Sequence, residues 1–338
     1  MLKFFRRIRR KLLDNGNLKN YLVYAVGEIV LVVVGILIAL QFNNWNQAHS
    51  DETKLVSLLR ELAVDLASEV DESEWVLDSY FKKDSLIALN LTGKLEEEDI
   101  QAICPECPRL LLLNYPRIPF NTIAYDQVKS MIDRIPKKYE YLIGQIKQLY
   151  EVDVKTVLDQ QASIELRTGN FRQSLISSYP WFRQVAYSQL SSEAVDFFLN
   201  DPIYMNRLAD YQNLGQKFWS YVNQFRGRAI HILHLISQIE DTNIEDVLES
   251  KAYFLDTDQV KRITGKYSMP KFNNVEFDIE IEESRIYIKG LQENHVELVP
   301  QSDSVLYFTS RFIKFKFNKE SLFLEGSDGS IFTCEKIE

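Results

Sequence analysis

Hydrophobic residues follow three different patterns along the chain, and the first is an apolar run. It extends from Tyr21 to Phe42 and is interrupted by one carboxylate, Glu28. As a helix that rises ~1.5 Å per residue, this run is about 33 Å long, enough to cross a hydrocarbon core of ~30 Å. Its many Leu, Ile, Val and Phe side chains favour membrane insertion. Their summed free energy outweighs the cost of inserting the single carboxylate of Glu28. We therefore predict that residues 21–42 form a single transmembrane helix.

The second pattern is helical periodicity. Apolar residues recur every three or four positions just after the apolar run, at Leu55, Leu59, Leu62, Leu66 and Val70. This stripe predicts an amphipathic helix that begins near Ser50 or Asp51, which are good caps, and a second helix that includes Phe81.

Helical periodicity resumes between Thr122 and Asp241. Breaks are expected at Pro136, Tyr179–Pro180 and Asn200–Pro202, because a residue that precedes proline is disfavoured in a helix. The spacing predicts four or five helices in this stretch. Residues 43–255 are therefore expected to form a mainly α-helical extramembrane domain.

The third pattern is strict alternation, which begins near residue 260. Val275 to Glu282 and Ile313 to Phe317 alternate apolar and charged residues, which is typical of half-buried strands. Short runs between and after these predict six or seven strands over residues 260–338, arranged as an antiparallel meander in a sandwich or partial barrel. The acidic face of the first strand and the basic face of the second are expected to lie side by side, and the alternative is that one of them meets a partner. The predicted fold class is α+β.

Charge gives the apolar run an orientation. Residues 1–20 carry seven basic residues against Asp14, a net charge of +6, whereas Asp51 and Glu52 follow the run. The positive-inside rule then places the N-terminus in the cytoplasm and the rest in the periplasm. We interpret residues 1–20 as a basic amphipathic segment on the inner leaflet. A cleaved signal peptide is the alternative, but the run is longer than ~15 residues and ends without a small-x-small site.

The net charge of the chain limits which binding partners can be expected. The chain carries a net charge of −9, so without the +6 of residues 1–20 the remainder carries −15. An acidic domain cannot displace counterions from a phosphate backbone, so we expect no nucleic-acid partner. The expected partners are the lipid bilayer and either further copies of the chain or another membrane protein.

The chain has three cysteines, of which Cys104 and Cys107 form a Cys-Pro-Glu-Cys sequence. In the periplasm this pair is expected to close a structural disulfide, and a thiol-redox pair is the alternative. Redox pairs stand at a helix N-terminus after a strand, whereas the residues before Cys104 are helical in pattern. A zinc site would need two more ligands.

The sequence lacks several motifs of known enzyme classes: it has no G-x-S-x-G, H-E-x-x-H or glycine-rich phosphate loop. His231 and His234 are three residues apart, but no carboxylate stands at a matching helical step, so a capped or core-edge pair is the favoured interpretation. We expect no catalytic residues, no cofactor and no metal site.

One face of the apolar helix is the strongest candidate for a functional surface. Helical steps place Glu28, Val32, Gly35 and Ala39 on this face. Gly35-x-x-x-Ala39 permits close approach of a second helix. A carboxylate inside a membrane is energetically costly, so its presence suggests a functional role. We expect this transmembrane face to pair with another helix. The alternative is that Glu28 extends to the inner interface.

Two segments resemble known families. KFFRRIRRKLL and YAVGEIVLVVVGILIALQFNNWN resemble the N-terminal signature of a family of uncharacterised single-pass membrane proteins common in Bacteroidota, and FNTIAYDQVKSM and LNDPIYMNRLADY are similar to its helical region. The resemblance covers roughly residues 1–240 and implies an anchor with a helical extramembrane domain. GKYSM, LVPQSDSVLYF and FKF are similar to the accessory β module of serine-hydrolase proteins.

These observations favour a non-enzymatic interaction or scaffold component of the inner membrane with a periplasmic domain. The alternative is an ion-conducting subunit of a stator-like complex that uses Glu28, although stator subunits carry Asp and a different outer domain. A tethered hydrolase or a thiol-redox protein is the lesser alternative.

Overall fold

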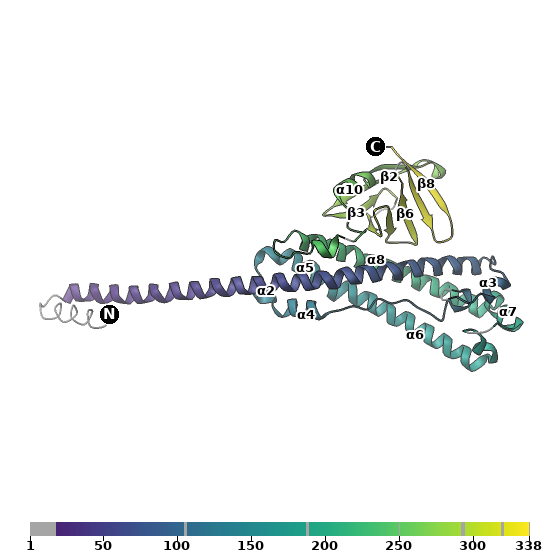
Figure 1. The fold of residues 1–338 in the computed structure, drawn as a ribbon, viewed down its shortest axis with the longest axis horizontal. Helices are drawn as coiled ribbons and strands as arrows, with labels where there is room; N and C mark the ends of the chain where they lie inside the picture. The colour runs from purple at the N-terminus through teal and green to yellow at the C-terminus, as the bar shows by residue number, and fades with distance from the viewer. Residues whose placement is uncertain are drawn as a thin grey trace. The chain divides into compact units, whose positions relative to one another are not determined.

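The computed structural model describes residues 18–104, 107–186, 189–249, 251–291, 295–318 and 321–337 (Figure 1). The chain is mainly helical, with a long apolar N-terminal helix and a C-terminal antiparallel barrel, so the predicted α+β class is confirmed. Its contacts divide it into two compact units. One comprises the chain up to Val56 with Met131–Lys137, and the other comprises Ser57–Ser130 with Lys138–Glu338.

The first described helix, α2 (Leu18–Leu91), is continuous. The prediction that a separate helix begins near Ser50 or Asp51 is therefore wrong. Phe81 also belongs to this same helix, and not to a second helix as was expected. The polar residues after Phe42 include neither Gly nor Pro, so nothing removes a backbone hydrogen bond there. The helix ends where Gly93 adopts a φ of 64°, the left-handed conformation that favours glycine after a helix.

The remaining α-helices follow in chain order. They are α3 (Glu97–Gln101), α4 (Ile123–Ser130), α5 (Glu140–Gln148), α6 (Val154–Ser178), α7 (Ser192–Asn200), α8 (Pro202–Ser237), α9 (Glu245–Leu248) and α10 (Thr257–Ile263). Helices α4 to α8 lie between Thr122 and Asp241, which confirms the predicted four or five. A π-helical turn, η4 (Leu149–Asp153), connects α5 to α6. The short 3-10 turns are η1 (Pro108–Leu110), η2 (Ile132–Arg134), η3 (Lys137–Tyr139), η5 (Pro180–Gln184) and η6 (Pro270–Phe272).

The expected proline breaks are also confirmed. Helix α6 ends at Ser178, just before Pro180, and α7 ends at Asn200. Asp201 then caps α8, because its Oδ1 accepts hydrogen bonds from the backbone nitrogens of Ile203 and Tyr204 at 2.9 and 2.8 Å.

The C-terminal domain is a closed barrel of eight antiparallel strands in sequence order. The strands are β1 (Gly265–Met269), β2 (Val275–Glu282), β3 (Arg285–Lys289), β4 (Val296–Pro300), β5 (Val305–Phe308), β6 (Ile313–Phe317), β7 (Leu322–Gly326) and β8 (Ile331–Lys336). Pairing of Tyr267 with Lys336 and of Ser268 with Glu335 closes the barrel. The prediction of six or seven strands is wrong because β1 has only two large apolar residues, too few to show a period.

Side chains inside the barrel are mainly aromatic and aliphatic, including Phe277, Phe315 and the buried thiol of Cys334. The expected contact between the acidic and basic strand faces is wrong, because β2 and β6 are not neighbours. Instead, Lys289 of β3 pairs with Glu280 and Glu282 of β2, at 2.5 and 2.8 Å. The acidic side chains of β2 are therefore paired with a basic side chain of the neighbouring strand β3.

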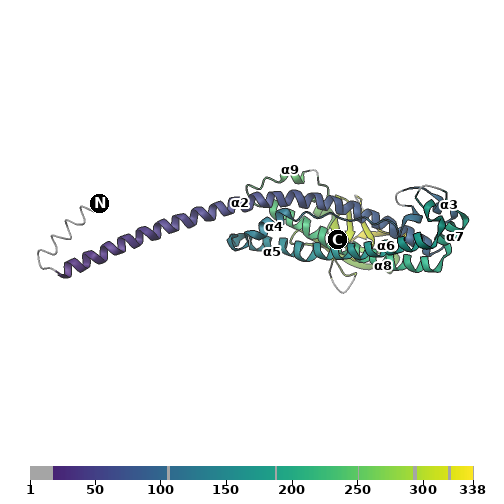
Figure 2. The same cartoon turned by 90° about the horizontal axis from the view of Figure 1, so that it is seen from below.

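Within the larger unit, the barrel lies on one side of α8 and α6 lies on the other (Figure 1). Figure 2 shows α5, α6 and α8 alongside one another, in agreement with their contacts. Trp219 of α8 is fully buried, donates a hydrogen bond from Nε1 to the carbonyl oxygen of Phe308 at 2.9 Å, and packs edge-on against Tyr307. The barrel and the helices therefore share a packed boundary.

Candidate functional site

The apolar part of α2 is exposed along its length. An 18-residue window in this helix has a mean hydropathy of 2.5, and none of it is buried within the molecule. Within the described residues, this is the one helix long and apolar enough to cross a membrane, a test of length and composition that a signal sequence also meets. An exposed apolar helix of this length is compatible with a single-pass membrane anchor.

The structure places Glu28, Val32, Gly35 and Ala39 on one helix, α2, at the steps that bring them to one face. Val32 is 55% exposed and Glu28 is partly exposed. A Cβ atom built on Gly35 would have no atom within 4 Å. The face is thus open to a second helix within the described part of the chain, and its pairing role stays a prediction.

The structure joins Cys104 and Cys107 in a disulfide. The pair follows α3 and precedes η1 (Pro108–Leu110), and Cys107 is buried. A strand does not lead into this pair, so the arrangement differs from that of thiol-redox motifs. A structural role of this disulfide stays a prediction.

His231 and His234 lie on α8, but they have different neighbours. The ring of His231 is within 3.0 Å of the Ser284 hydroxyl through Nδ1 and within 3.3 Å of the Tyr141 hydroxyl through Nε2. His234 contacts Gln238 through Nε2 at 2.9 Å. Burial lowers the pKa of both imidazoles. Among the described residues, no three candidate ligands converge on a point suitable for a metal ion.

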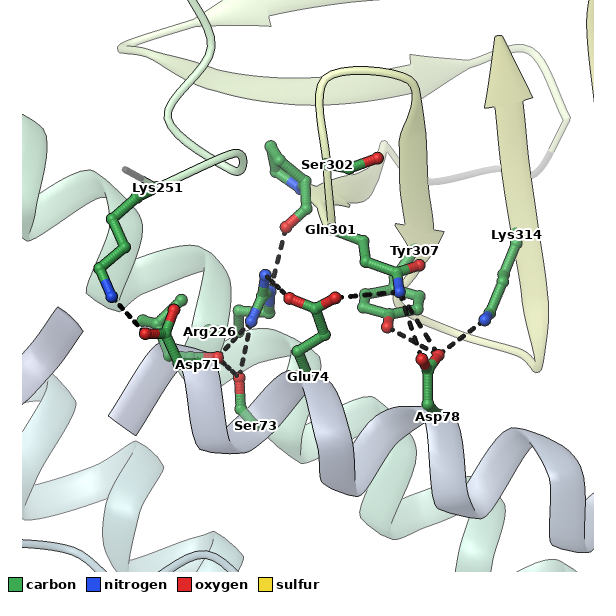
Figure 3. Close-up of polar contacts among 12 residues, drawn as sticks. Asp71, Ser73, Glu74, Asp78, Arg226, Lys251, Gln301, Ser302, Tyr307 and Lys314 are labelled. Atoms are coloured by element: carbon green, nitrogen blue, oxygen red, sulfur yellow. Dashed lines mark hydrogen bonds and ion pairs between the residues drawn. The ribbon is translucent and has the colours of Figure 1, made fainter. Parts of the chain in front are cut away.

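The most extensive polar site joins the helices to the barrel, and we call it the helix–barrel junction (Figure 3). It is formed by Asp71, Ser73, Glu74 and Asp78 of α2, Arg226 of α8, Lys251, and Gln301, Tyr307 and Lys314 of the barrel domain. Asp71, Glu74 and Asp78 are spaced at helical steps of three and four, so they share the face of α2 that is turned towards α8 and the barrel.

Arg226 is the centre of the helix–barrel junction, and its side chain is fully buried. It donates from Nε to the carbonyl oxygen of Pro300 at 3.0 Å and from Nη1 to the Ser73 hydroxyl at 3.0 Å and to the Val70 carbonyl oxygen. Nη2 lies 3.7 Å from Glu74 Oε2. Burial lowers the pKa of this guanidinium while the surrounding charges oppose the shift. One cation thus connects α2, α8 and β4.

Asp78 makes the second set of contacts. Its Oδ1 lies 2.7 Å from Lys314 Nζ, and it accepts a hydrogen bond from the Tyr307 hydroxyl at 3.1 Å. Gln301 donates to the Glu74 carboxylate at 3.3 Å and lies 3.4 Å from Asp78 Oδ2. Burial, with Asp78 nearby, raises the pKa of Tyr307, which keeps its hydroxyl a donor. Strands β5 and β6 are thereby attached to α2.

A further ion pair lies where the barrel contacts α8. Arg285 of β3 donates from Nε and Nη2 to the two oxygens of Glu297 of β4, at 2.7 and 2.5 Å. Burial raises the pKa of Glu297, and the Arg285 guanidinium opposes this. Gly227 of α8 lies against the same carboxylate. The pair is therefore held between two strands and a helix.

The helix–barrel junction was not predicted from the sequence. A signal existed, because Asp71, Glu74 and Asp78 repeat at helical steps on a helix whose other faces are apolar or mixed, and Arg226 stands in the apolar run of α8. A charged residue at a core position implies a buried partner. The partners on the barrel could not be assigned without the packing of two domains.

Residues 28–101 match a family of unknown function (DUF6090). The match begins inside the apolar run and continues to the end of α3. It supports the expected resemblance to an uncharacterised family, and it implies no activity. Comparison of the chain with curated proteins and with solved structures finds no match. The wider resemblance, over residues 1–240, and that of the β domain stay predictions.

Proposed function

We propose that this protein is a non-enzymatic interaction or scaffold component of the inner membrane, anchored by one helix. The observation that carries this proposal is the apolar part of α2, which the chain leaves fully unburied. The Glu28, Val32, Gly35 and Ala39 face would pair with a second helix, either of another copy or of another membrane protein. The lipid bilayer is the other partner.

The matched family supports an anchor that is retained. The match begins at residue 28, within the apolar run, and continues through the helix that follows. Helix α2 also continues from the apolar run to Leu91 without a break. A signal peptide has an apolar region of about 7–15 residues, which is shorter than this run.

The predicted orientation belongs to the same proposal. The +6 charge of residues 1–20 supports a cytoplasmic N-terminus, and the acidic remainder supports a periplasmic location for the helical and β parts. The Cys104–Cys107 disulfide is compatible with an oxidising compartment. Resemblance of the β domain to an accessory module, whose role is not catalytic, is also in keeping with a binding role.

The helix–barrel junction supports a scaffold with fixed geometry. Arg226 and Asp78 each contact more than one element, and their partners lie on both the helices and the barrel. Breaking such a junction would leave a buried charge without a partner, which costs several kcal/mol. The barrel would therefore present any binding surface in a constant position relative to α8.

Photo-crosslinking within the membrane tests the proposed pairing face. A photoreactive residue at position 35 should give a specific crosslinked product, because Gly35 lies on the pairing face. The matched control is position 37, where Leu37 is 59% exposed and points about 200° away around the helix. Equal crosslinking from both positions, or none from position 35, would refute the pairing face.

The stator-like alternative rests on Glu28, a partly exposed carboxylate within the apolar run. A measurement of proton flux into vesicles that contain the protein distinguishes the scaffold function from the stator-like function. The scaffold predicts no flux from the native chain and altered crosslinking at position 35 in Glu28→Gln. A flux that the native chain supports and Glu28→Gln abolishes would favour the stator-like function.

A further inference from the structure

A cavity of about 180 Å³ lies between α6 and α8, away from the helix–barrel junction and from the anchor. Its apolar walls include Leu112, Phe171 and Leu214, and its polar lining includes Arg167, Thr168, Asn170, Arg207 and Asp210. A single water needs only ~15 Å³. The space is large enough for a small organic molecule, though smaller than the pockets of drug-sized ligands.

One residue of the cavity lining, Thr168, has a buried hydroxyl without a partner in the described part of the chain. Thr168 is only 5% exposed, yet its Oγ1 has no hydrogen-bond partner among the described residues. A buried polar group that stays unsatisfied costs about 1–3 kcal/mol, so native structures rarely keep one without a reason. An acceptor in the cavity would satisfy this hydroxyl.

The two arginines of the cavity differ in their partners. Arg167 forms an ion pair with Asp210. Arg207 lies with its guanidinium carbon 5.0 Å from the centre of the Phe171 ring, and no carboxylate of the described part of the chain pairs with it. A guanidinium stacked on an aromatic ring keeps its edge N–H groups for an acceptor. Arg207 therefore has N–H groups available to donate to a ligand.

We propose that this cavity binds a small carboxylic acid in its anionic form. The carboxylate would accept hydrogen bonds from Arg207 and the Thr168 hydroxyl, and the apolar part would pack on Phe171 and Leu214. Charge selects the ligand: Arg167, Arg207 and Asp210 together give +1, which balances a monoanion. A phosphate dianion would be left with an unbalanced charge beside Asp210.

Calorimetric titration of the full chain in detergent micelles tests this site, with sodium benzoate as the probe and sodium chloride of equal ionic strength as the blank. We expect saturable binding of one benzoate per chain. Both Arg207→Gln and Thr168→Val should weaken binding about tenfold or more, because each removes a hydrogen bond to a charged group. Arg172→Gln, an exposed arginine on α6 outside the cavity lining, should bind as the native chain does.

The variants also report whether an effect is specific. Thr168→Val should fold with an unchanged or higher melting temperature, because it removes the unsatisfied hydroxyl at nearly constant shape. Four results would overturn the proposal: no saturable binding to the native chain, native-like binding by Thr168→Val, weakening by Arg172→Gln equal to that by Arg207→Gln, or tighter binding of inorganic phosphate than of benzoate.

Discussion

Glu69 of α2 is a carboxylic acid whose position favours the protonated form. It is 4% exposed, and its Oε1 accepts a hydrogen bond from the backbone nitrogen of Asn121 at 2.7 Å. Its Oε2 is buried without a partner among the described residues. Burial, with Asp65 nearby, raises the pKa of Glu69 to about 8, against the opposing hydrogen bond from Asn121. At neutral pH the folded protein therefore keeps this proton.

Glu69 should make stability fall with rising pH. Its folded pKa lies above its ordinary value of 4.5, so between those values the native state holds a proton that the unfolded state has released. The contribution is complete below about pH 4.5 and is lost as the pH rises through about 8, at up to ~1.4 kcal/mol per pH unit. We predict that Glu69→Gln removes this contribution to the pH dependence of the free energy of unfolding, measured by urea denaturation from pH 5 to 8. Glu61→Gln, an exposed control on the same helix, should retain the native slope.

Gly227 of α8 illustrates a residue fixed by the approach of a neighbour. A Cβ atom at this position would lie 2.6 Å from Glu297 Oε1 and 2.9 Å from its Cδ. The carboxylate cannot move away freely because Arg285 holds both of its oxygens. We predict that Gly227→Ala lowers the free energy of unfolding by about 1–3 kcal/mol.

Gly144 of α5 is the matched control for this substitution. It is also helical, but a Cβ atom there would have no atom within 4 Å. Gly144→Ala should raise the free energy of unfolding by about 0.5–1 kcal/mol, through helix propensity alone. Urea denaturation that shows the same sign for both variants would mean that Glu297 does not restrict Gly227.

Among the elements, those with strong periodicity or proline punctuation were predictable. The stripe from Leu59 to Val70 is buried as expected, and α7 and α8 meet at Pro202. The continuity of α2 was not predictable from the polar residues after Phe42, because such residues occur equally in exposed helix and in loops. Strand β1 is too short to reveal a period, and its pairing with β2 and β8 defines it.

The helix–barrel junction could not be predicted because its partners come from elements far apart in sequence. Arg226 contacts Val70 and Ser73 on one side and Pro300 on the other. Each residue alone is an ordinary polar residue. The same is true of Thr168 and Arg207, which belong to two helices and become a candidate site only when α6 packs on α8.

Arg226 should determine how firmly the barrel is attached to the helices. Arg226→Met keeps much of the side-chain volume but removes the donors to Ser73 and Pro300 and leaves Glu74 without this cation. We predict a loss of about 3 kcal/mol in the free energy of unfolding. Hydrogen exchange should also speed up in β4 and β5, which face the junction. Arg172→Met, on the exposed surface of α6, should change neither measurement.

At the scale of the whole molecule, the chain combines an unburied apolar helix with a unit that has its own cores. The barrel interior and the stripe on α2 are filled by side chains of the larger unit. The apolar residues up to Phe42 add nothing to either core. Membrane attachment and folding of the remainder should therefore be separable.

Truncation tests this separation. A chain that begins at Asn43 loses the apolar run but keeps the residues that form both cores, so it should be soluble, with the helical and β content that circular dichroism reports for the full chain. If the apolar helix spans the bilayer as proposed, the full chain should stay in the membrane fraction after an alkaline carbonate wash. Removal of residues 2–17 is the matched control, since it keeps the apolar run and should leave the protein in the membrane. Release of the full chain by carbonate would exclude a spanning helix, and aggregation of the truncated chain would show that the helix contributes to the fold of the remainder.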